Sequence, residues 1–137
     1  PDVLQLKEFC GFPGMKVLQF LSSEQWAAEA ENENVVYYTG TNDNDTLLGW
    51  YRKEIEAGLD RPGGCPDICW EFIELLYSSK AAWVIVPMQD ILCLGSEARM
   101  NTPGTIGDNW NWRLAKADLT DRLAGDLAEL CRKYNRF

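Results

Sequence analysis

The chain has 137 residues, of which 46% are hydrophobic and 25% charged, the composition of one globular domain with a core of its own. Its net charge of -8 argues against a nucleic-acid partner, because phosphate binding needs clustered lysines and arginines. No stretch approaches the roughly 20 apolar residues of a membrane span, so we also expect no membrane partner. The first residues lack the long apolar region of a signal peptide, and a start at Pro1 is compatible with a piece of a longer protein.

The histidine and cysteine content limits the kinds of catalytic and metal site that the chain can contain. The chain has no histidine, which excludes a Ser-His-Asp triad, a Cys-His pair and a His-ligated metal. Acid–base chemistry therefore falls to carboxylates, tyrosine, lysine or cysteine. The five cysteines are odd in number and irregularly spaced, and only Cys65 and Cys69 lie close together. We therefore expect reduced cysteines, no disulfide framework, no metal site and no cofactor.

Three apolar runs, residues 15–21, 34–40 and 81–88, predict buried strands. None alternates cleanly between apolar and polar residues, which is typical of parallel strands covered on both faces. The residues between the second and third runs have helical spacing, so the order is strand, helix, strand. This order predicts an α/β sheet.

The first helical pattern follows the second run. From Leu48 to Leu59, apolar residues recur every three or four positions, with Asp45 or Thr46 as the N-cap and Gly58 near the end. We therefore expect a helix with one apolar face packed on the sheet.

Two more helices are predicted beyond a break at residues 61–64. Asp67 stands at the N-cap position of residues 68–79, which are apolar around most of the helix and should be well buried. Residues 118–134 carry a single stripe of leucines, which predicts an amphipathic helix.

A polar segment follows each predicted strand: residues 22–26, 41–45 and 89–112. Chemistry in α/β sheets sits beyond the carboxyl ends of the strands. We therefore expect these three segments to meet at one end of the sheet.

The run Asn42-Asp43-Asn44-Asp45 is the first candidate site. Asp45 is better placed to cap the following helix, which leaves Asp43 without an obvious structural duty. Asn42 and Asn44 fit either turn residues or amides that bind a polyhydroxylated ligand. The chain has 6 Trp, 5 Tyr and 5 Phe, and aromatic faces beside amides and acids suit a sugar site.

The segment after the third run allows two interpretations. Asp90 fits a helix cap, and Glu97 with Arg99 fits a structural ion pair. Alternatively, these residues belong to a functional loop, since loops at this end of a sheet tend to carry function.

Four blocks together resemble one enzyme family: FPGMKVLQF (12–20), VVYYTGTNDNDT (35–46), VPMQDILCLGSEARMNTPGT (86–105) and NWNWRL (109–114). They resemble the 4-alpha-glucanotransferases, called amylomaltase in bacteria and disproportionating enzyme in plants, which form glycoside hydrolase family seventy-seven. The resemblance implies an α/β fold that is the C-terminal part, about three strands plus helices, of a (β/α)8 TIM barrel. Residues 1–137 would then be a segment of one catalytic barrel with no internal domain boundary.

The resemblance also implies an activity and partners. Members transfer α-1,4-glucan segments between maltooligosaccharides by a retaining mechanism, which uses an Asp nucleophile and a Glu acid/base. The expected partners are α-1,4-glucans, maltooligosaccharides and the remainder of the barrel, in the same or another chain. No cofactor is implied, and the expected compartment is the cytoplasm, with the plastid as the alternative.

Four residues carry over from the family to this sequence. Asp43 matches the catalytic Asp that favours the transition state, Phe20 matches an aromatic residue on the acceptor side, and Asn101 lies in a loop on the donor side. Asn42 stands where the family has a histidine that binds the sugar at the cleavage point, so we expect it to bind substrate through one N–H.

The family's nucleophile and acid/base lie before the first matching block. Glu8 is not in the family's Glu-Asp-Leu-Gly setting, so we expect neither carboxylate in this chain and no activity from the chain alone. The alternatives are a non-catalytic glucan-binding module and an inert fragment.

Overall fold

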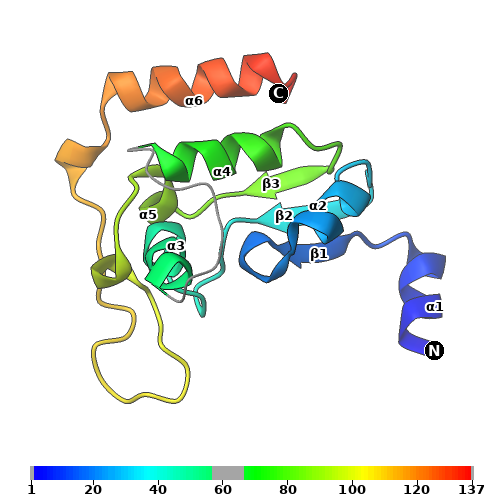
Figure 1. Cartoon of the computed structure of the whole chain (residues 1–137), viewed down its shortest axis with the longest axis horizontal. Helices are drawn as coiled ribbons and strands as arrows, with labels where there is room; N and C mark the ends of the chain where they lie inside the picture. Colours follow the sequence, from blue (N-terminus) through cyan, green and yellow to red (C-terminus); the bar gives the residue numbers. More distant parts are fainter. Residues whose placement is uncertain (1, 57–66, 137) are drawn as a thin grey trace.

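The computed structural model describes residues 2–56 and 67–136. The elements in chain order are α1 (Asp2–Cys10), β1 (Gly14–Val17), the 3₁₀ turn η1 (Leu18–Phe20), α2 (Ser23–Glu29), β2 (Val35–Tyr38), α3 (Leu47–Glu56), α4 (Ile68–Tyr77), β3 (Trp83–Ile85), α5 (Met88–Ile91), η2 (Ser96–Ala98), η3 (Lys116–Asp118) and α6 (Asp121–Lys133). Figure 1 shows α4 lying between the sheet and α6, with α1 apart from the rest.

The sheet has three strands in the order β1-β2-β3, and both pairings are parallel. Met15 lies beside Val36, and Val36 lies beside Trp83. Parallel neighbours need a crossover connection, which α2 supplies between β1 and β2, and α3 with α4 between β2 and β3. The prediction of an α/β fold with three strands is therefore confirmed.

The strands are shorter than the apolar runs that predicted them. After Val17 the chain turns into η1, where the Leu21 N–H donates to the Leu18 carbonyl over 3.0 Å. This turn buries both leucines, so the strand prediction for residues 18–21 is wrong. The third run ends in α5, because Pro87 has no N–H for a ladder and stands at the N-cap of that helix.

Three α-helices were not expected: α1, the short α5 and α2. The last of these occupies residues predicted as a polar segment after the first strand. Ser22 starts α2 with a capping box: its Oγ accepts from Gln25 N–H at 3.2 Å, and its own N–H donates to Gln25 Oε1 at 2.9 Å. The S-x-x-Q pattern was therefore a readable helix start.

In the part of the chain that the structure describes, helices cover one face of the sheet and leave the other open. Val35 and Tyr37 point to the covered face and are fully buried. Met15, Trp83 and Ile85 point to the other face and are 57%, 66% and 44% exposed. The expectation that both faces are covered is therefore wrong for this chain, although the open face is as apolar as the covered one.

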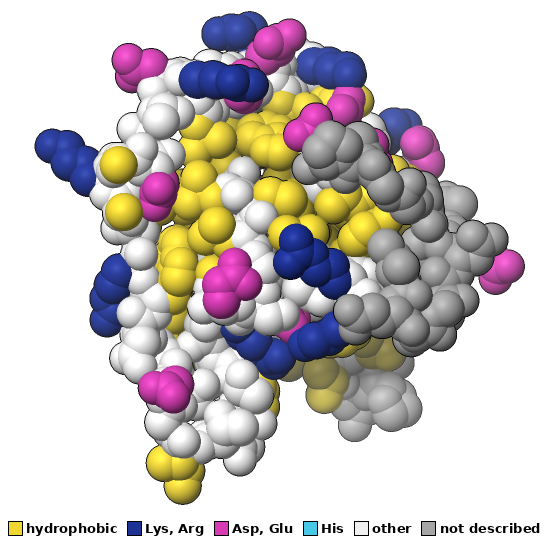
Figure 2. All heavy atoms as spheres, turned by 60° about the vertical axis from the view of Figure 1, so that its left-hand side comes forward, with side chains coloured by type: hydrophobic (Ala, Val, Ile, Leu, Met, Phe, Trp, Pro, Cys, Tyr) yellow, Lys and Arg dark blue, Asp and Glu magenta, His cyan; other side chains and the backbone are white. Residues whose placement is uncertain are grey.

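Figure 2 shows hydrophobic side chains gathered across the middle of one face of the molecule, with charged side chains around them. Apolar side chains are also exposed on α1, including Val3, Leu6 and Phe9. Within the described part of the chain, no helix is long and apolar enough to cross a membrane.

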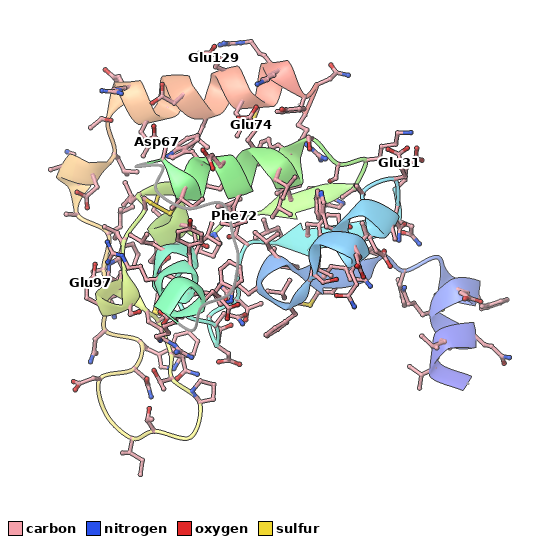
Figure 3. All side chains as sticks on the ribbon, viewed as in Figure 1. Glu31, Asp67, Phe72, Glu74, Glu97 and Glu129 are labelled. Carbon is pink, nitrogen blue, oxygen red and sulfur yellow. A yellow bond between two sulfur atoms is a disulfide. The ribbon has the colours of Figure 1, made fainter. Side chains whose placement is uncertain are left out.

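The α4 helix forms the middle layer, as its apolar sequence predicts. Its Ile73 and Leu76 are fully buried. Phe72 points from α4 toward α3 (Figure 3), where its ring lies 5.8 Å from that of Trp50 and 5.9 Å from that of Tyr51. These edge-on aromatic contacts join the two crossover helices.

The outer helix α6 begins later than predicted. Thr120 is its N-cap, with Oγ1 accepting from Leu123 N–H at 3.1 Å. Glu74 on α4 faces α6 (Figure 3) and accepts from Tyr134 Oη at 2.8 Å as well as from the Lys133 ammonium. The Arg136 guanidinium donates to the carbonyls of Tyr77, the last residue of α4, and of Ser79 and Ala81 just beyond it.

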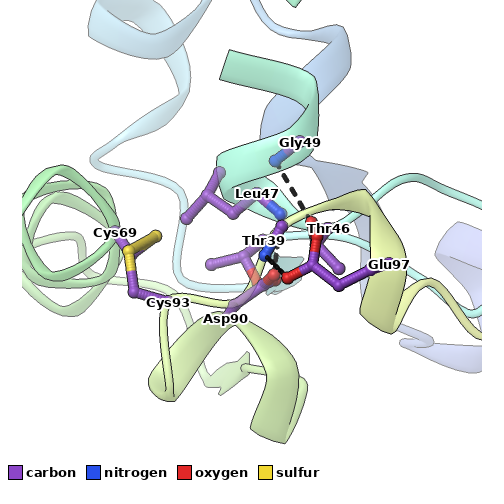
Figure 4. Close-up of a disulfide and its surroundings, with 9 residues drawn as sticks. Thr39, Thr46, Leu47, Gly49, Cys69, Asp90, Cys93 and Glu97 are labelled. Carbon is purple, nitrogen blue, oxygen red and sulfur yellow. Dashed lines mark hydrogen bonds between the residues drawn. A yellow bond between two sulfur atoms is a disulfide. The ribbon is translucent and has the colours of Figure 1, made fainter. Parts of the chain in front are cut away.

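Two cap predictions need correction. Thr46 is the N-cap of α3, since its Oγ1 accepts from Gly49 N–H at 3.1 Å (Figure 4), so the preference for Asp45 is wrong. Asp67 stands at the N-cap position of α4 but its side chain makes no cap hydrogen bond. The predicted helix end near Gly58, the break at 61–64 and Cys65 lie outside the described residues.

A disulfide contradicts the expectation of reduced cysteines. Cys69 in α4 is bonded to Cys93 in the segment after α5 (Figure 4). The 24-residue separation hides this pair from any reading of close cysteine spacing. The bond ties the middle helix to the segment that follows β3.

Asp90 links three elements from inside the core (Figure 4). It is 1% exposed, and its carboxylate accepts from Thr39 Oγ1 at 2.6 Å and from Leu47 N–H at 2.7 Å. Burial raises the pKa of this carboxyl above its usual value, and the two donors act in the opposite direction. Asp90 thereby caps α3 from a position 43 residues away in sequence and holds the end of β2 beside it.

We expect Asp90→Ala to lower the free energy of unfolding by about 3 kcal/mol, because Thr39 and Leu47 would be left with buried, unsatisfied donors. Urea unfolding of the complete protein that carries this chain, followed by tryptophan fluorescence, measures the change. Asp126→Ala, which removes a carboxylate from the exposed side of α6, is the control and should change stability by about 0.5 kcal/mol or less. A loss below about 1 kcal/mol for Asp90→Ala would contradict a structural role for this carboxylate.

Candidate active site

Asp45 joins the segments that follow all three strands. Its carbonyl accepts from Gln19 Nε2 at 2.9 Å, and its Oδ2 accepts from Ser96 Oγ at 2.9 Å. Oδ2 also pairs with the Lys53 ammonium of α3, and Oδ1 accepts from Thr46 N–H at 2.9 Å. The prediction that the strand-end segments meet is confirmed for residues 41–45 and 89–112, whereas the contact from the end of the first strand comes from Gln19 and not from residues 22–26.

The ionised form of Asp45 is favoured in the folded chain. Burial opposes ionisation, but hydrogen bonds from Lys53 and Ser96 outweigh it, so the pKa of this carboxyl lies below its usual value. The ionised Asp45 carboxylate therefore helps to hold in place the turn that contains Asp43.

Asn44 shapes that turn. Its Oδ1 accepts from both the N–H and the Oγ1 of Thr41, at 2.9 and 2.7 Å, and its N–H donates to the Thr41 carbonyl at 3.2 Å. Of the two interpretations of Asn44, the structure supports the turn residue. The turn projects Asn42 and Asp43 into solvent.

Two amides hold one oxygen of Asp43. Oδ1 accepts from Asn101 Nδ2 at 2.6 Å and from Asn42 Nδ2 at 3.0 Å. No hydrogen bond reaches Oδ2 from residues 2–56 or 67–136. The carboxylate is thus oriented through one oxygen and open to solvent through the other.

Arg99 and the main chain bind the Asp43 turn to the Asn101 loop. Arg99 donates through Nη2 to the Asp43 carbonyl and through Nε to the Asn101 carbonyl, both at 2.7 Å. The Asn101 N–H donates to the Asn42 carbonyl at 3.1 Å. The expected pair between Glu97 and Arg99 is not formed in the described structure, because Glu97 instead accepts from Gly95 N–H.

A cavity of about 220 Å³ lies beside this junction. It is lined by Gly40, Thr41, Asn42, Asn44, Asp45, Thr46, Pro87, Gln89, Asp90, Arg99, Met100 and Trp110. Trp110 has φ 63°, a left-handed conformation unusual for a residue with a side chain, and is 53% exposed. Its main-chain N–H donates to the Met100 carbonyl at 2.6 Å, which holds the Trp110 backbone beside the cavity.

The four predicted site residues do not all converge. Asn42, Asp43 and Asn101 are joined by hydrogen bonds, whereas Phe20 ends η1 at the same sheet end, 72% exposed. Arg99 was not among the predicted site residues, although one of the two interpretations of its segment placed it in a functional loop. Its contacts could not be read from the sequence, since the main-chain carbonyls that it binds have no sequence signature.

The arrangement is suited to polar ligands with hydroxyl groups. An open carboxylate oxygen accepts hydroxyl hydrogen bonds and stabilises a nearby positive charge, and an aromatic ring and amides lie within the same junction. Among the described residues, no group of three or more acids and cysteines is placed to hold a metal ion.

The profile of the 4-alpha-glucanotransferases matches residues 1–120. The chain belongs to this family. It is 42% identical to the 4-alpha-glucanotransferase of Synechocystis sp., with 99% of this chain and 29% of the relative covered. It is 40% identical to that of Thermus thermophilus, covering 99% of this chain and 31% of the relative. The chloroplastic/amyloplastic enzyme of Arabidopsis thaliana is 38% identical, with 98% and 26% covered.

The fold agrees with the family. The amylomaltase from Streptococcus agalactiae, solved in complex with acarbose, superposes with a TM-score of 0.79 and 32% identity. The match covers 98% of this chain and 30% of that one. The chain therefore spans under a third of the length of each of these four relatives.

Asp45 should make the free energy of unfolding depend on pH. Because its folded pKa lies below the ordinary 3.8, its contribution is fully present above pH 3.8 and is lost as the pH falls through the folded value. The difference in unfolding free energy between the wild type and Asp45→Asn, measured by urea unfolding of the complete protein, should therefore be largest near neutral pH and shrink as the pH falls. A difference that stays constant or grows toward low pH would contradict the assignment.

Proposed function

We propose that the protein carrying this chain is a 4-alpha-glucanotransferase that moves α-1,4-glucan segments between maltooligosaccharides with retention of configuration. The observation that carries the proposal is the Asp43 carboxylate, held through Oδ1 and open at Oδ2 in a chain of this family. We propose the cytoplasm as its compartment, with the plastid as the alternative that the plant relatives suggest.

Asp43 acts in this proposal on the sugar at the cleavage point. The transition state of glycoside transfer resembles an oxocarbenium ion, so a fixed negative charge beside the ring favours it over the ground state. Oδ2 is the oxygen available to the sugar hydroxyls, because two amides already use Oδ1. Asn42 and Asn101 lie beside the same sugar, and exposed Phe20 offers an aromatic surface to the acceptor glucan.

The remainder of a (β/α)8 barrel completes the fold in this proposal. The open sheet face carries Met15, Trp83 and Ile85, whose apolar side chains would be buried by further strands closing around them. A parallel sheet is stable when both faces are covered, which supports residues 1–137 as one segment of a single barrel.

The proposed division of labour predicts that these 137 residues alone do not turn over substrate. The nucleophile and the acid/base would come from outside the chain, and both are needed for a retaining mechanism. Maltotriose incubated with the isolated chain should release no glucose above the blank, while the protein with a complete barrel should release it. Clear turnover by the isolated chain would refute the claim that it lacks these carboxylates.

Measurements of binding and turnover separate this proposal from the two alternatives, a glucan-binding module and an inert fragment. Maltooligosaccharide binding without turnover by the complete protein would indicate a non-catalytic glucan-binding module. Failure of the isolated chain to unfold cooperatively would be expected of a barrel segment and equally of an inert fragment, so turnover by the complete protein is what decides between them.

In the complete protein, Asp43→Asn should lower kcat by about 10²- to 10³-fold with a smaller change in KM, because the lost charge acts mainly in the transition state. Initial rates of glucose release from maltotriose measure both constants. Asp126→Asn removes the same charge from the exposed surface of α6 and should leave both constants within about twofold of wild type. An unchanged kcat for Asp43→Asn would remove the residue from the catalytic machinery.

A further inference from the structure

Among the described residues, Arg99 makes the one side-chain hydrogen bond to the main chain of Asp43. Its Nη2 donates to the Asp43 carbonyl and its Nε to the Asn101 carbonyl, each over 2.7 Å. The two acceptors belong to segments that follow different strands, β2 and β3. A single guanidinium therefore spans the junction on which the orientation of Asp43 depends.

We propose that Arg99 is a positioning residue for the transfer reaction, which fixes the backbone of Asp43 against the Asn101 loop so that Oδ2 faces the substrate. This inference rests on the proposed function. Arg99 acts through Asp43 and does not need to touch the sugar itself.

The geometry favours positioning over a general structural role. The guanidinium is a planar fork, so two bonds to two carbonyls fix both the distance and the orientation of the segments that carry them. With the Asp43 carbonyl held, the Asn101 amide is placed to donate to Oδ1, and the Asn101 N–H closes onto the Asn42 carbonyl. The bonds from Arg99 to the Asp43 carbonyl and from Asn101 to Oδ1 are exposed, so water competes for both acceptors once the fork is gone.

Arg99 does not pair with the nearby acid Glu97, which was one of the two interpretations of the sequence. Glu97 is two residues away, yet it bonds to Gly95 N–H and leaves Arg99 to the two carbonyls. Arg99 also lines the cavity beside the turn, together with Asn42 and Trp110. Its place in the site is thus set by carbonyl acceptors rather than by a neighbouring acid.

Arg113 offers a matched control in the same loop. Its Nη1 donates to the carbonyls of Trp110 and Trp112 at 2.7 and 2.8 Å, so it also binds two main-chain oxygens. Both oxygens belong to its own segment, and neither belongs to the Asp43 turn. Arg113→Ala therefore removes the same chemistry without breaking the junction.

The test compares Arg99→Ala, Arg99→Lys and Arg113→Ala in the complete protein, with glucose release from maltotriose as the assay. We expect Arg99→Ala to lower kcat on the order of 10²-fold, as a small misplacement of a catalytic group does, with KM within about threefold. Methylguanidinium added to this variant should restore part of the lost kcat. Arg99→Lys should stay below the wild type, because an ammonium cannot reproduce the fork, and Arg113→Ala should stay within about threefold of wild type.

Several results would overturn the inference while leaving the proposed function intact. They are a loss of kcat under about threefold in Arg99→Ala, an equal loss in Arg113→Ala, or a rise in KM alone, which would make Arg99 a substrate-binding group. If Arg99→Ala fails to fold, an Arg99→Lys variant that folds with wild-type kcat would overturn it, and one that folds with reduced kcat would support it. No transfer by the wild-type protein would overturn the proposed function and this inference with it.

Discussion

The buried carboxylate of Asp90 is the interaction on which the rest of the site depends. One of its oxygens accepts from Thr39, where β2 ends, and the other from the first N–H of α3 at Leu47. These two bonds fix both ends of the turn that contains Asp43. A carboxylate buried this deeply is stable only when hydrogen-bond donors satisfy both of its oxygens. Thr39 and Leu47 must therefore stay beside Asp90, and this fixes the turn between them. The Cys69–Cys93 disulfide anchors the segment carrying Asp90 to α4, and therefore to the core.

Above Asp90, the site is a set of contacts between segments far apart in the sequence. Asp45 accepts hydrogen bonds from Gln19, which follows β1, and from Ser96, which follows β3. Asn101 meets Asp43 across 58 residues of sequence. Parallel strands place their carboxyl ends at one edge, so residues from separate crossovers converge there without any local signal. The four polar residues of the turn therefore have different roles. Asn44 and Asp45 hold the turn in place, the Asn42 amide orients the Asp43 carboxylate, and Asp43 keeps one carboxylate oxygen open.

Local chemistry was a good guide where a residue's partner lies nearby and a poor guide elsewhere. The helical spacing of α3 and α4 and the leucine stripe of α6 predicted real helices, because apolar periodicity reports directly on burial. Asp45 was expected to cap α3, but Lys53 and Ser96 engage its side chain, and Thr46 takes the cap. The apolar runs overstated the strands, since Leu18 and Leu21 are buried by a turn rather than by a ladder. Burial is visible in sequence, whereas the backbone shape that achieves it is not.

The sequence by itself determined the α/β class, the helices between the second and third strands, the family resemblance and, through that resemblance, Asp43 as the candidate catalytic residue. These follow from apolar periodicity and from motifs that are continuous in the chain. Only the tertiary structure decided that Asn42 and Asn101 share one oxygen of Asp43, that Arg99 binds two carbonyls rather than Glu97, and that Cys69 pairs with Cys93. Each of these contacts joins residues or main-chain atoms whose proximity depends on how the crossovers bring the strand ends together, and no local pattern encodes that proximity.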